Sequence, residues 1–440
     1  MDRATSRVAR VPAIALRRAS MFSHPTARAF ARDAPTRVMS HHHHHTRLSA
    51  CETFDVVALG NLCVDVLCAP APIPPPRELK TKRALDALMT QSSDRTRWEL
   101  GGNCNFVIAA ARLGLSAASA GHVGDDRYGE FVARELAIEG VQHVELISRH
   151  DRAHVSALAE TLVCFVLSDG AGAHAFCSRY DLGPWPLMRD VSEVSNDARD
   201  ALRRCRAVFV NGFVFDELKP RAVKHAVGLA KSNGAGVFFD PGPRAFTFAD
   251  ATNASRLEAL DVALCAADVV LATEEELAAL TGVPLRSAPE RYAEAIFNYP
   301  NSAAEWVVVK RGADGAFLVT RDGHSVAVGC PVVKVGDTVG CGDSSAAAYV
   351  LGYLRARAEP ALDVGEALET TVTLATHVGS ATAMNLGAGR NVARAETVLD
   401  LLSEGATGKT RGVSKVAAAA ARSVLQDAVA RRGSSQIQLS

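Results

Sequence analysis

The chain has 440 residues, of which 48% are hydrophobic and 22% are charged. This ordinary globular composition excludes a chain that is disordered throughout, a collagen and a coiled coil. Lys and Arg together number 48 and so do Asp and Glu, so we expect no nucleic-acid partner. No run of 18 apolar residues occurs, so the sequence predicts no membrane-spanning helix and no membrane partner.

The two ends of the chain are basic. Residues 1–50 hold nine Arg, no Lys and two acidic residues, and residues 403–440 hold six basic and two acidic residues. An Arg-rich, Ser-rich and acid-poor start is typical of an organellar transit peptide. We therefore expect a transit peptide or a disordered segment over 1–50, a folded domain over 51–402 and a basic tail over 403–440. The tail is expected to be an amphipathic helix or disordered.

Short apolar stretches alternate with helical segments along the middle of the chain. The proline-rich residues 70–76 are expected to be extended, and they belong to an insert over 69–99. The expected strands cover 55–60, 64–67, 117–123, 144–147, 207–210, 236–240, 268–272, 307–310 and 315–319. Expected helices cover 79–89, 106–113, 128–139, 221–232, 256–263, 344–356 and 365–383. This alternation predicts an α/β fold with a parallel sheet wrapped by helices, and a hairpin over 160–167 and 173–176 predicts a small β lid.

The most informative stretch is Gly336-Asp-Thr-Val-Gly-Cys-Gly-Asp343, directly before the expected helix over 344–356. Its glycines let the backbone approach a ligand closely, and the free N–H groups of a helix's first turn attract anions. A carboxylate beside a bound phosphate is repelled, so Asp343 makes sense as the group that accepts a proton from an attacking hydroxyl. Alternatively, Asp343 is a helix N-cap. The residues alone leave both interpretations open.

Three blocks resemble a known family. Residues 337–343 resemble the Asp-Thr-Thr-Gly-Ala-Gly-Asp block of the ribokinase-like, or PfkB, carbohydrate kinases, and Leu100–Asn105 with Ala109–Gly114 resembles their N-terminal Gly-Gly…Asn block. The stretch 121–129 is also typical. The resemblance implies a doubly wound, mostly parallel sheet with helices on both faces and a small β lid. The Trp-Glu-x-Gly-Gly-Asn-Cys-Asn segment and the proline-rich insert are most similar to a plant and algal branch, which implies a chloroplast location, with the mitochondrion as the alternative.

The resemblance also implies roles for individual residues. Asp343 matches the family's catalytic base. The anion hole matches Gly340, Cys341 and Gly342. Arg244 matches a residue that faces a phosphate. The residues that match the sugar site are Asp65, Gly101, Gly102 and Asn105. Those that match the nucleotide site are Lys310, Gly312, Gly315, Asn385 and Gly387. Glu276 matches the magnesium network, and Asp337 with the carbonyl of Val339 matches potassium ligands.

Three features depart from the family pattern. The N-terminal block is one residue shorter than the family's common Gly-Gly-x-x-x-Asn. The family's Asn-x-x-Glu is Thr273-Glu-Glu-Glu276 here, and its Asp-Pro-Asn-x-Arg is Asp240-Pro-Gly-Pro-Arg244. Three of these residues also have a purely structural interpretation. Glu276 could belong only to the acidic first turn of a helix, and Asp337 could cap its own turn. Cys341 could be a small residue in place of Ala rather than a redox-sensitive thiol.

The sequence therefore predicts ATP-dependent phosphorylation of a sugar or nucleoside hydroxyl, with Mg²⁺ and K⁺ as the expected cofactors. The alternative is a catalytically silent organellar scaffold with a kinase fold. The loss of the family's two Asn residues, at Thr273 and Gly242, favours this alternative. The sequence leaves open which sugar or nucleoside is the substrate. A homodimer through the lid is a further expectation.

Overall fold

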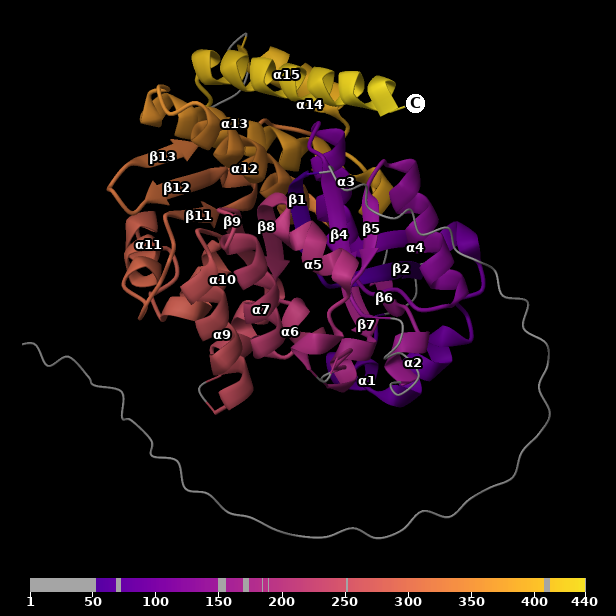
Figure 1. Cartoon of the computed structure of the whole chain (residues 1–440). Helices are drawn as coiled ribbons and strands as arrows, with labels where there is room; N and C mark the ends of the chain where they lie inside the picture. The colour runs from indigo at the N-terminus through magenta and orange to yellow at the C-terminus, as the bar shows by residue number, and fades with distance from the viewer. Residues whose placement is uncertain are drawn as a thin grey trace, which may run out of the picture. The chain divides into compact units, whose positions relative to one another are not determined.

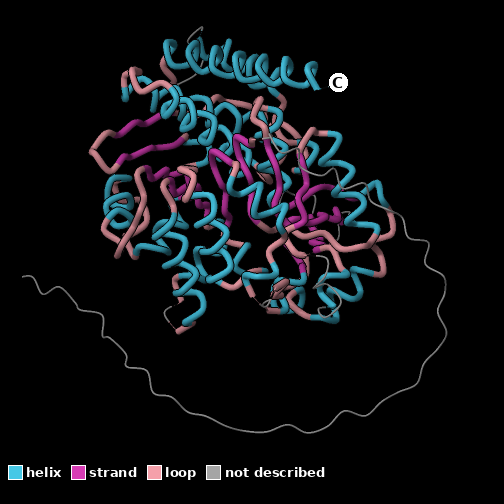
Figure 2. Tube along the Cα trace, viewed as in Figure 1, coloured by secondary structure: helices cyan, strands magenta, loops and turns pink. Residues whose placement is uncertain are grey.

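The computed structural model describes residues 53–68, 73–148, 156–168, 174–183, 185–188, 190–250, 252–406 and 412–439. The expected transit peptide lies outside these residues, as does the start of the expected proline-rich loop. Figure 2 shows helices and strands alternating along the described chain. In this part of the chain no helix combines the length and apolarity that crossing a membrane requires.

A nine-stranded sheet forms the centre of the fold (Figure 1). Its strands, in spatial order, are β13 (Ser325–Val328), β12 (Ala316–Thr320), β11 (Trp306–Lys310), β10 (Val269–Thr273), β9 (Gly236–Asp240), β8 (Cys205–Asn211), β1 (Phe54–Leu59), β4 (Ala117–Gly121) and β5 (Gln142–Glu145). The strands from β5 to β11 pair in parallel, and β12 and β13 pair antiparallel at one edge. The buried apolar runs of the central strands are those of a sheet that is covered on both faces.

Helices cover both faces of this sheet. Along β1, Val56 and Ala58 belong to one apolar core and Val57 and Leu59 to the other. The first core also contains α3 (Asn103–Arg112), α4 (Arg127–Ile138), α12 (Cys341–Ala358), α13 (Val364–Ala383), α14 (Ala395–Ala406) and α15 (Lys415–Leu439). The second contains α5 (Asn196–Arg203), α6 (Val214–Glu217), α7 (Pro220–Lys231), α8 (Ala245–Phe248), α9 (Ala254–Ala266), α10 (Glu274–Thr281) and α11 (Pro289–Phe297). The predicted doubly wound α/β fold is confirmed.

A second, four-stranded sheet forms the predicted lid. Its strand order is β3 (Trp98–Gly102), β2 (Leu62–Cys68), β6 (Leu162–Ser168) and β7 (His174–Ser178). The β6–β7 pair is the expected hairpin, whereas β3 was not predicted from the sequence. Two short helices, α1 (Pro76–Leu79) and α2 (Lys82–Met89), precede β3. The buried Trp98 ring packs against Tyr128 and Phe131 of α4 and so anchors the lid to the body.

Helix α12 begins earlier than the sequence predicts. It starts at Cys341 rather than at 344, and its N-cap is Gly340, whose φ is 79°. Asp343 is therefore the third residue inside the helix, and its interpretation as an N-cap is wrong. The left-handed backbone at Gly340 favours glycine, and it turns the loop sharply into the helix.

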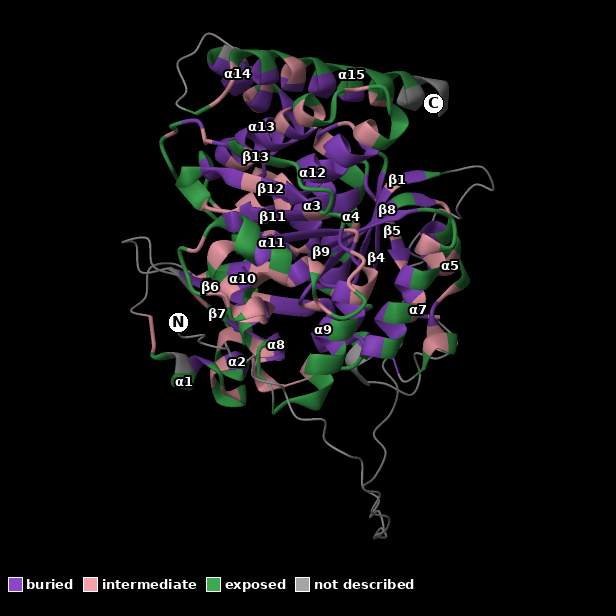
Figure 3. Cartoon of the chain, turned by 90° about the vertical axis from the view of Figure 1, so that its left-hand side faces the viewer, coloured by how far each residue is buried: buried purple, intermediate pink, exposed green. Residues whose placement is uncertain are grey.

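The C-terminal tail forms the helix α15, which packs on the body. A Cβ at Gly114 would lie 2.4 Å from the backbone carbon of Ala428, so the two backbones are in direct contact. Arg432 donates hydrogen bonds to the carbonyls of Ala111, Leu115 and Gly140, where α3 and α4 end. Figure 3 shows exposed residues along α15 and a buried main sheet below it.

Candidate active site

The predicted site residues gather at the carboxyl ends of the central strands. Asp240 ends β9, Thr273 ends β10 and Lys310 ends β11. The first turns of α3 and α12 bring Asn105 and Asp343 to the same place. Ligands of open α/β sheets bind at this end of the strands.

Asp343 is held by one amide side chain. The Nδ2 atom of Asn105 donates to Oδ2 of Asp343 over 3.0 Å. The Oδ1 atom of Asn105 accepts from the N–H of Gly389 over 2.8 Å, which fixes the orientation of the amide. Asn105 therefore positions the carboxylate that the sequence analysis assigns as the base. Gly389, which the sequence analysis did not single out, anchors Asn105.

The lid brings a second carboxylate to the site. A Cβ at Gly101 would lie only 2.2 Å from Oδ1 of Asp65, so the carboxylate rests on the glycine. Gly102 has a φ of 59°, and a Cβ there would lie 2.4 Å from the carbonyl oxygen of Asn61. Both glycines are thus required by close contacts. Burial raises the pKa of Asp65 to about 7, and the nearby Asp343 adds to the effect.

The pKa of Asp343 is also raised. Burial raises it to about 6, while the Asn105 hydrogen bond works in the opposite direction. Asp240 raises the pKa further and Lys310 lowers it. A carboxylate with this pKa is ionised at neutral pH and is a stronger base than an ordinary aspartate.

The first-turn amides of α12 lie next to this carboxylate. Such amides lack intrahelical acceptors, although the N–H of Cys341 bonds to the Thr338 carbonyl over 3.3 Å. Burial, followed by the charges of Asp337 and Asp343, raises the pKa of the Cys341 thiol to about 12. The thiol therefore stays protonated at neutral pH, which supports the interpretation of Cys341 as a small residue.

An ion pair lies beside the same turn. Lys310 Nζ is 2.6 Å from Oδ2 of Asp240, and both side chains are largely buried. Glu276 completes a capping box with Thr273, in which Oε2 of Glu276 accepts the Thr273 N–H over 2.8 Å. Burial and then the charge of Asp240 raise the pKa of Glu276. Thr273, which stands in place of the family's Asn, thus has a structural role.

The predicted nucleotide turn is a tight loop between β11 and β12. Arg311 N–H donates to the Gly315 carbonyl over 2.9 Å, and Gly315 N–H donates to the Gly312 carbonyl over 3.1 Å. A Cβ at Gly315 would lie 2.0 Å from the Val328 carbonyl oxygen. Gly315 is therefore required by the packing of β13, and its contact with a nucleotide stays a prediction.

Asp337 links two loops. Its Oδ1 accepts the N–H of Val339 and its Oδ2 accepts the N–H of Gly387, each over 3.1 Å. The Asn385 side chain donates to the carbonyl of Asn391 over 2.8 Å within the second loop. The hydrogen bond from the Val339 N–H fits the interpretation of Asp337 as a turn cap, and the potassium ion stays a prediction.

Arg244 lies in a cluster of its own. Its Nε is 2.6 Å from Oδ2 of Asp216, which also pairs with Arg256. The guanidinium lies over the Phe213 ring, 4.5 Å from the centroid. Arg244 is thus oriented by a carboxylate and an aromatic ring, and its contact with a phosphate stays a prediction.

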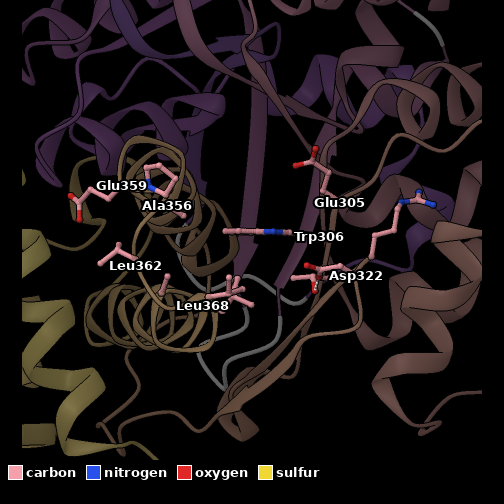
Figure 4. Close-up of a pocket in the computed structure, with 12 residues that line it drawn as sticks. Glu305, Trp306, Asp322, Ala356, Glu359, Leu362 and Leu368 are labelled. Atoms are coloured by element: carbon pink, nitrogen blue, oxygen red, sulfur yellow. Dashed lines mark hydrogen bonds between the residues drawn. The ribbon is translucent and has the colours of Figure 1, made fainter.

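Two cavities lie away from these residues. One, of about 420 Å³, lies at the amino end of β11, and Trp306, Glu305, Asp322 and Glu359 are among the residues that line it (Figure 4). Another, of about 610 Å³, lies beside α15 and is lined by Asp55 of β1, by Ser116 just before β4 and by Arg206 of β8. Neither cavity is lined by any of the predicted site residues.

Comparison with known proteins agrees with this arrangement. Residues 79–395 match the model of the pfkB family carbohydrate kinases. The chain belongs to this family. It is therefore a carbohydrate kinase, which transfers a phosphoryl group to an alcohol acceptor.

The individual relatives share less than a third of their residues with this kinase. The chain is 28% identical over 319 residues to 5-dehydro-2-deoxygluconokinase 2 of Bacillus cereus, covering 68% of this chain and 83% of the relative. An E. coli protein assigned as ribokinase II, in complex with ATP and Mg²⁺, is 20% identical with a TM-score of 0.58, over 80% of this chain and 99% of that one. Arabidopsis thaliana ribokinase with ribose and ATP is also 20% identical, with a TM-score of 0.56 and the same coverage. These structures support the ribokinase-like fold.

Sequence reasoning missed two features of this kinase site. The first is the Lys310–Asp240 pair, whose members are 70 residues apart in the chain. The second is Gly389, whose φ of 59° and contact with Leu100 bring the loop after α13 against β3. The Gly387-Ala-Gly389 repeat was a signal for a tight loop, but nothing in the sequence showed which side chain it would hold.

Proposed function

We propose that this kinase transfers the γ-phosphoryl group of ATP to a primary hydroxyl of a sugar or nucleoside, with Asp343 as the general base. The observation that carries the proposal is the placement of a carboxylate, oriented by Asn105, inside the first turn of α12. The amides of this turn, from Gly340 to Gly342, supply the anion hole.

In the proposed reaction the hydroxyl oxygen forms a bond to the γ-phosphorus while the bond from that phosphorus to the ADP oxygen breaks. The hydroxyl proton passes to Asp343, and the electron pair of the broken phosphorus–oxygen bond stays on ADP. A carboxylate is a much weaker base than an alkoxide, so the proton moves late, as the new bond forms. Most of the rate enhancement then comes from positioning and from the amides that face the transferred group.

The residues on the phosphate side fit Mg²⁺. This ion is usually held by one or two carboxylates together with substrate phosphates rather than by a protein cage. Within the described residues no cluster of three or more His, Cys, Asp or Glu could hold a metal ion. Glu276 would hold the ion together with the ATP phosphates. When bound, Mg²⁺ neutralises charge on the ATP phosphates.

The lid side is proposed to bind the acceptor. Asp65 and Asn105 face the space beside Asp343 and would bind hydroxyl groups. The relatives' names suggest which acceptors to try first, namely 5-dehydro-2-deoxygluconate and ribose. Fructose and adenosine complete the panel.

The test is ATP turnover on this panel with the wild type, Asp343→Asn and Asp427→Asn. Asp427 lies on α15, far along the chain from the proposed base, and serves as the matched control. We expect turnover with at least one acceptor, its loss by about 10³-fold in Asp343→Asn with an unchanged circular dichroism spectrum, and its retention in Asp427→Asn. Absence of turnover and of ATP binding in the wild type would instead favour the silent scaffold.

Three further expectations from the sequence also stay predictions. They are a potassium ion held by Asp337 and the Val339 carbonyl, a homodimer through the lid, and a plant or algal chloroplast location. The last depends on residues 1–50, which lie outside the described residues.

A further inference from the structure

Lys310 occupies an unusual place for a residue of a nucleotide turn. It is the last residue of β11 and pairs with Thr273 of β10, so its side chain starts at the carboxyl edge of the sheet. The side chain is 16% exposed and runs to Asp240, whose Oδ2 lies 2.6 Å from Nζ. The other oxygen of Asp240 accepts the N–H of Gly242 over 3.0 Å. Asp240 is therefore a fixed support for the ammonium group.

The ammonium group lies over the start of α12. A Cβ placed on Gly342 would lie 3.6 Å from Lys310 Nζ. Because glycine has no side chain, nothing from this residue stands between the ammonium and the helix's first turn. The Lys310 ammonium and the first-turn amides thus face one space, and Asp343 follows Gly342 directly.

The charges around this space are unbalanced. Asp240, Glu276 and Asp343 all act on Lys310 electrostatically, so three carboxylates share one ammonium group. An ammonium group has three N–H donors, and Asp240 is the partner of one of them. A second anion with oxygen acceptors, such as a phosphoryl group, could therefore be contacted without loss of the ion pair.

We propose that Lys310 is a catalytic residue whose ammonium group, held by Asp240, binds the oxygens of the transferred phosphoryl group above the Gly342 backbone. This inference rests on the proposed function. Lys310 keeps its proton throughout: the acceptor oxygen–phosphorus bond forms, the phosphorus–ADP oxygen bond breaks, and the hydroxyl proton goes to Asp343. The ammonium stabilises charge that moves across the phosphoryl oxygens, so its effect is on turnover more than on the affinity for ATP.

The experiment compares Lys310→Met, Lys310→Arg and the double variant Lys310→Met/Asp240→Asn with the wild type. Turnover is measured on the acceptor with the highest rate, and the Kd of a non-hydrolysable ATP analogue is measured by titration. Lys231→Met is the matched control, because Lys231 forms a 2.8 Å pair with Asp268 at the opposite edge of the sheet. Melting curves show whether each variant is folded.

We expect turnover of Lys310→Met to fall by about 10²–10³-fold, the effect of removing one donor from a developing anion, while the Kd of the analogue changes less than tenfold. Lys310→Arg should retain more activity than Lys310→Met, and Lys231→Met should match the wild type.

The double variant separates catalysis from charge neutralisation. If Lys310 only neutralised Asp240, removing both charges would restore turnover to within tenfold of the wild type and overturn the proposal. A loss that lies wholly in the Kd of the analogue would also overturn it, because Lys310 would then only bind the nucleotide. An inactive wild type would count against the proposed function, whereas an active wild type with an equally active Lys310→Met would count against Lys310 alone.

Discussion

Two lysine–aspartate pairs at opposite edges of the main sheet show how neighbours decide what an ion pair does. At the amino edge, Lys231 lies 2.8 Å from Asp268, and it also donates to the Ala266 carbonyl. The other oxygen of Asp268 accepts the N–H of Val237 over 2.7 Å. This pair connects the end of α7 to the starts of β9 and β10, so its partners are all structural.

The pair at the carboxyl edge has different neighbours. Lys310 and Asp240 lie among Glu276, Asp343 and the first turn of α12. Burial and the attraction of Asp240 act in opposite directions on the pKa of Lys310, and together with Glu276 the attraction prevails and raises it. The excess of carboxylates at the carboxyl edge suits a cation, and the Lys310 ammonium with the first-turn amides of α12 suits a phosphate. The partners of the amino-edge pair, in contrast, are structural. The same residue types thus serve chemistry at one edge and structure at the other.

The strongest way to break this contrast is to fill the space between Lys310 and the helix turn. In Gly342→Val the new side chain would enter the 3.6 Å gap to the ammonium group. We expect turnover to fall by at least about 10²-fold, since the first-turn amides could no longer receive the phosphoryl group. Steady-state kinetics on the best acceptor measures the loss. Turnover within threefold of the wild type would contradict the placement of the anion hole.

A smaller effect should follow from loosening the base. Asn105→Ala removes the 3.0 Å hydrogen bond that stabilises the ionised form of Asp343. We expect turnover to fall by about 10- to 100-fold, since the base is no longer oriented. The pKa of Asp343 should rise, so the acidic limb of the rate profile should move to higher pH. A matched set of pH–rate profiles measures both, and an unmoved limb would show that Asn105 does not act through Asp343.

Potassium should have a still smaller effect. An ion at Asp337 would fix the loop that leads to Gly340 without touching the acceptor, so turnover should rise several-fold and affinity should not change. The comparison is turnover in potassium and in tetramethylammonium at equal ionic strength. Equal rates would show that the loop is held without an ion.

The smallest effect is expected at the amino edge. Lys231→Met should lower the free energy of unfolding by about 1 kcal/mol, because the pair is partly exposed and screened. Turnover should stay within twofold of the wild type. Urea unfolding and steady-state kinetics test the two halves of this expectation, and a tenfold loss of turnover would remove the distinction between the edges.

The sequence predicted the fold well where apolar runs were long. The expected strand over 236–240 matches β9 in both bounds, because a run of bulky apolar residues between a glycine and an Asp-Pro leaves few alternatives. Strand β3 was missed because Trp-Glu-Leu-Gly-Gly ends in two glycines, which weaken a strand on their own. Strand β3 is stabilised instead by its pairing with β2 and by the close contact between Gly101 and the Asp65 carboxylate.

The site was predicted only in part. The block around Asp343 is local in sequence, so its glycines and its helix could be recognised together, although Cys-Gly-Asp did not indicate that the helix begins at Cys341. Contacts between distant segments could not be predicted in the same way. Asn105 and Asp343 are 238 residues apart, and Asn105 and Gly389 are 284 apart. Only the folded sheet brings these segments to one edge.

The central claim, that Asp343 is the base, is tested most directly by the pH dependence of kcat/KM for the best acceptor. A base must be ionised to accept a proton, and the pKa of Asp343 is about 6. The rate should therefore be level above pH 7 and fall about tenfold for each pH unit below about 6. The Asp343→Asn variant should lose the activity, and its residual rate should no longer fall at acidic pH. A wild-type profile that stays flat from pH 5 to pH 8 would contradict the account.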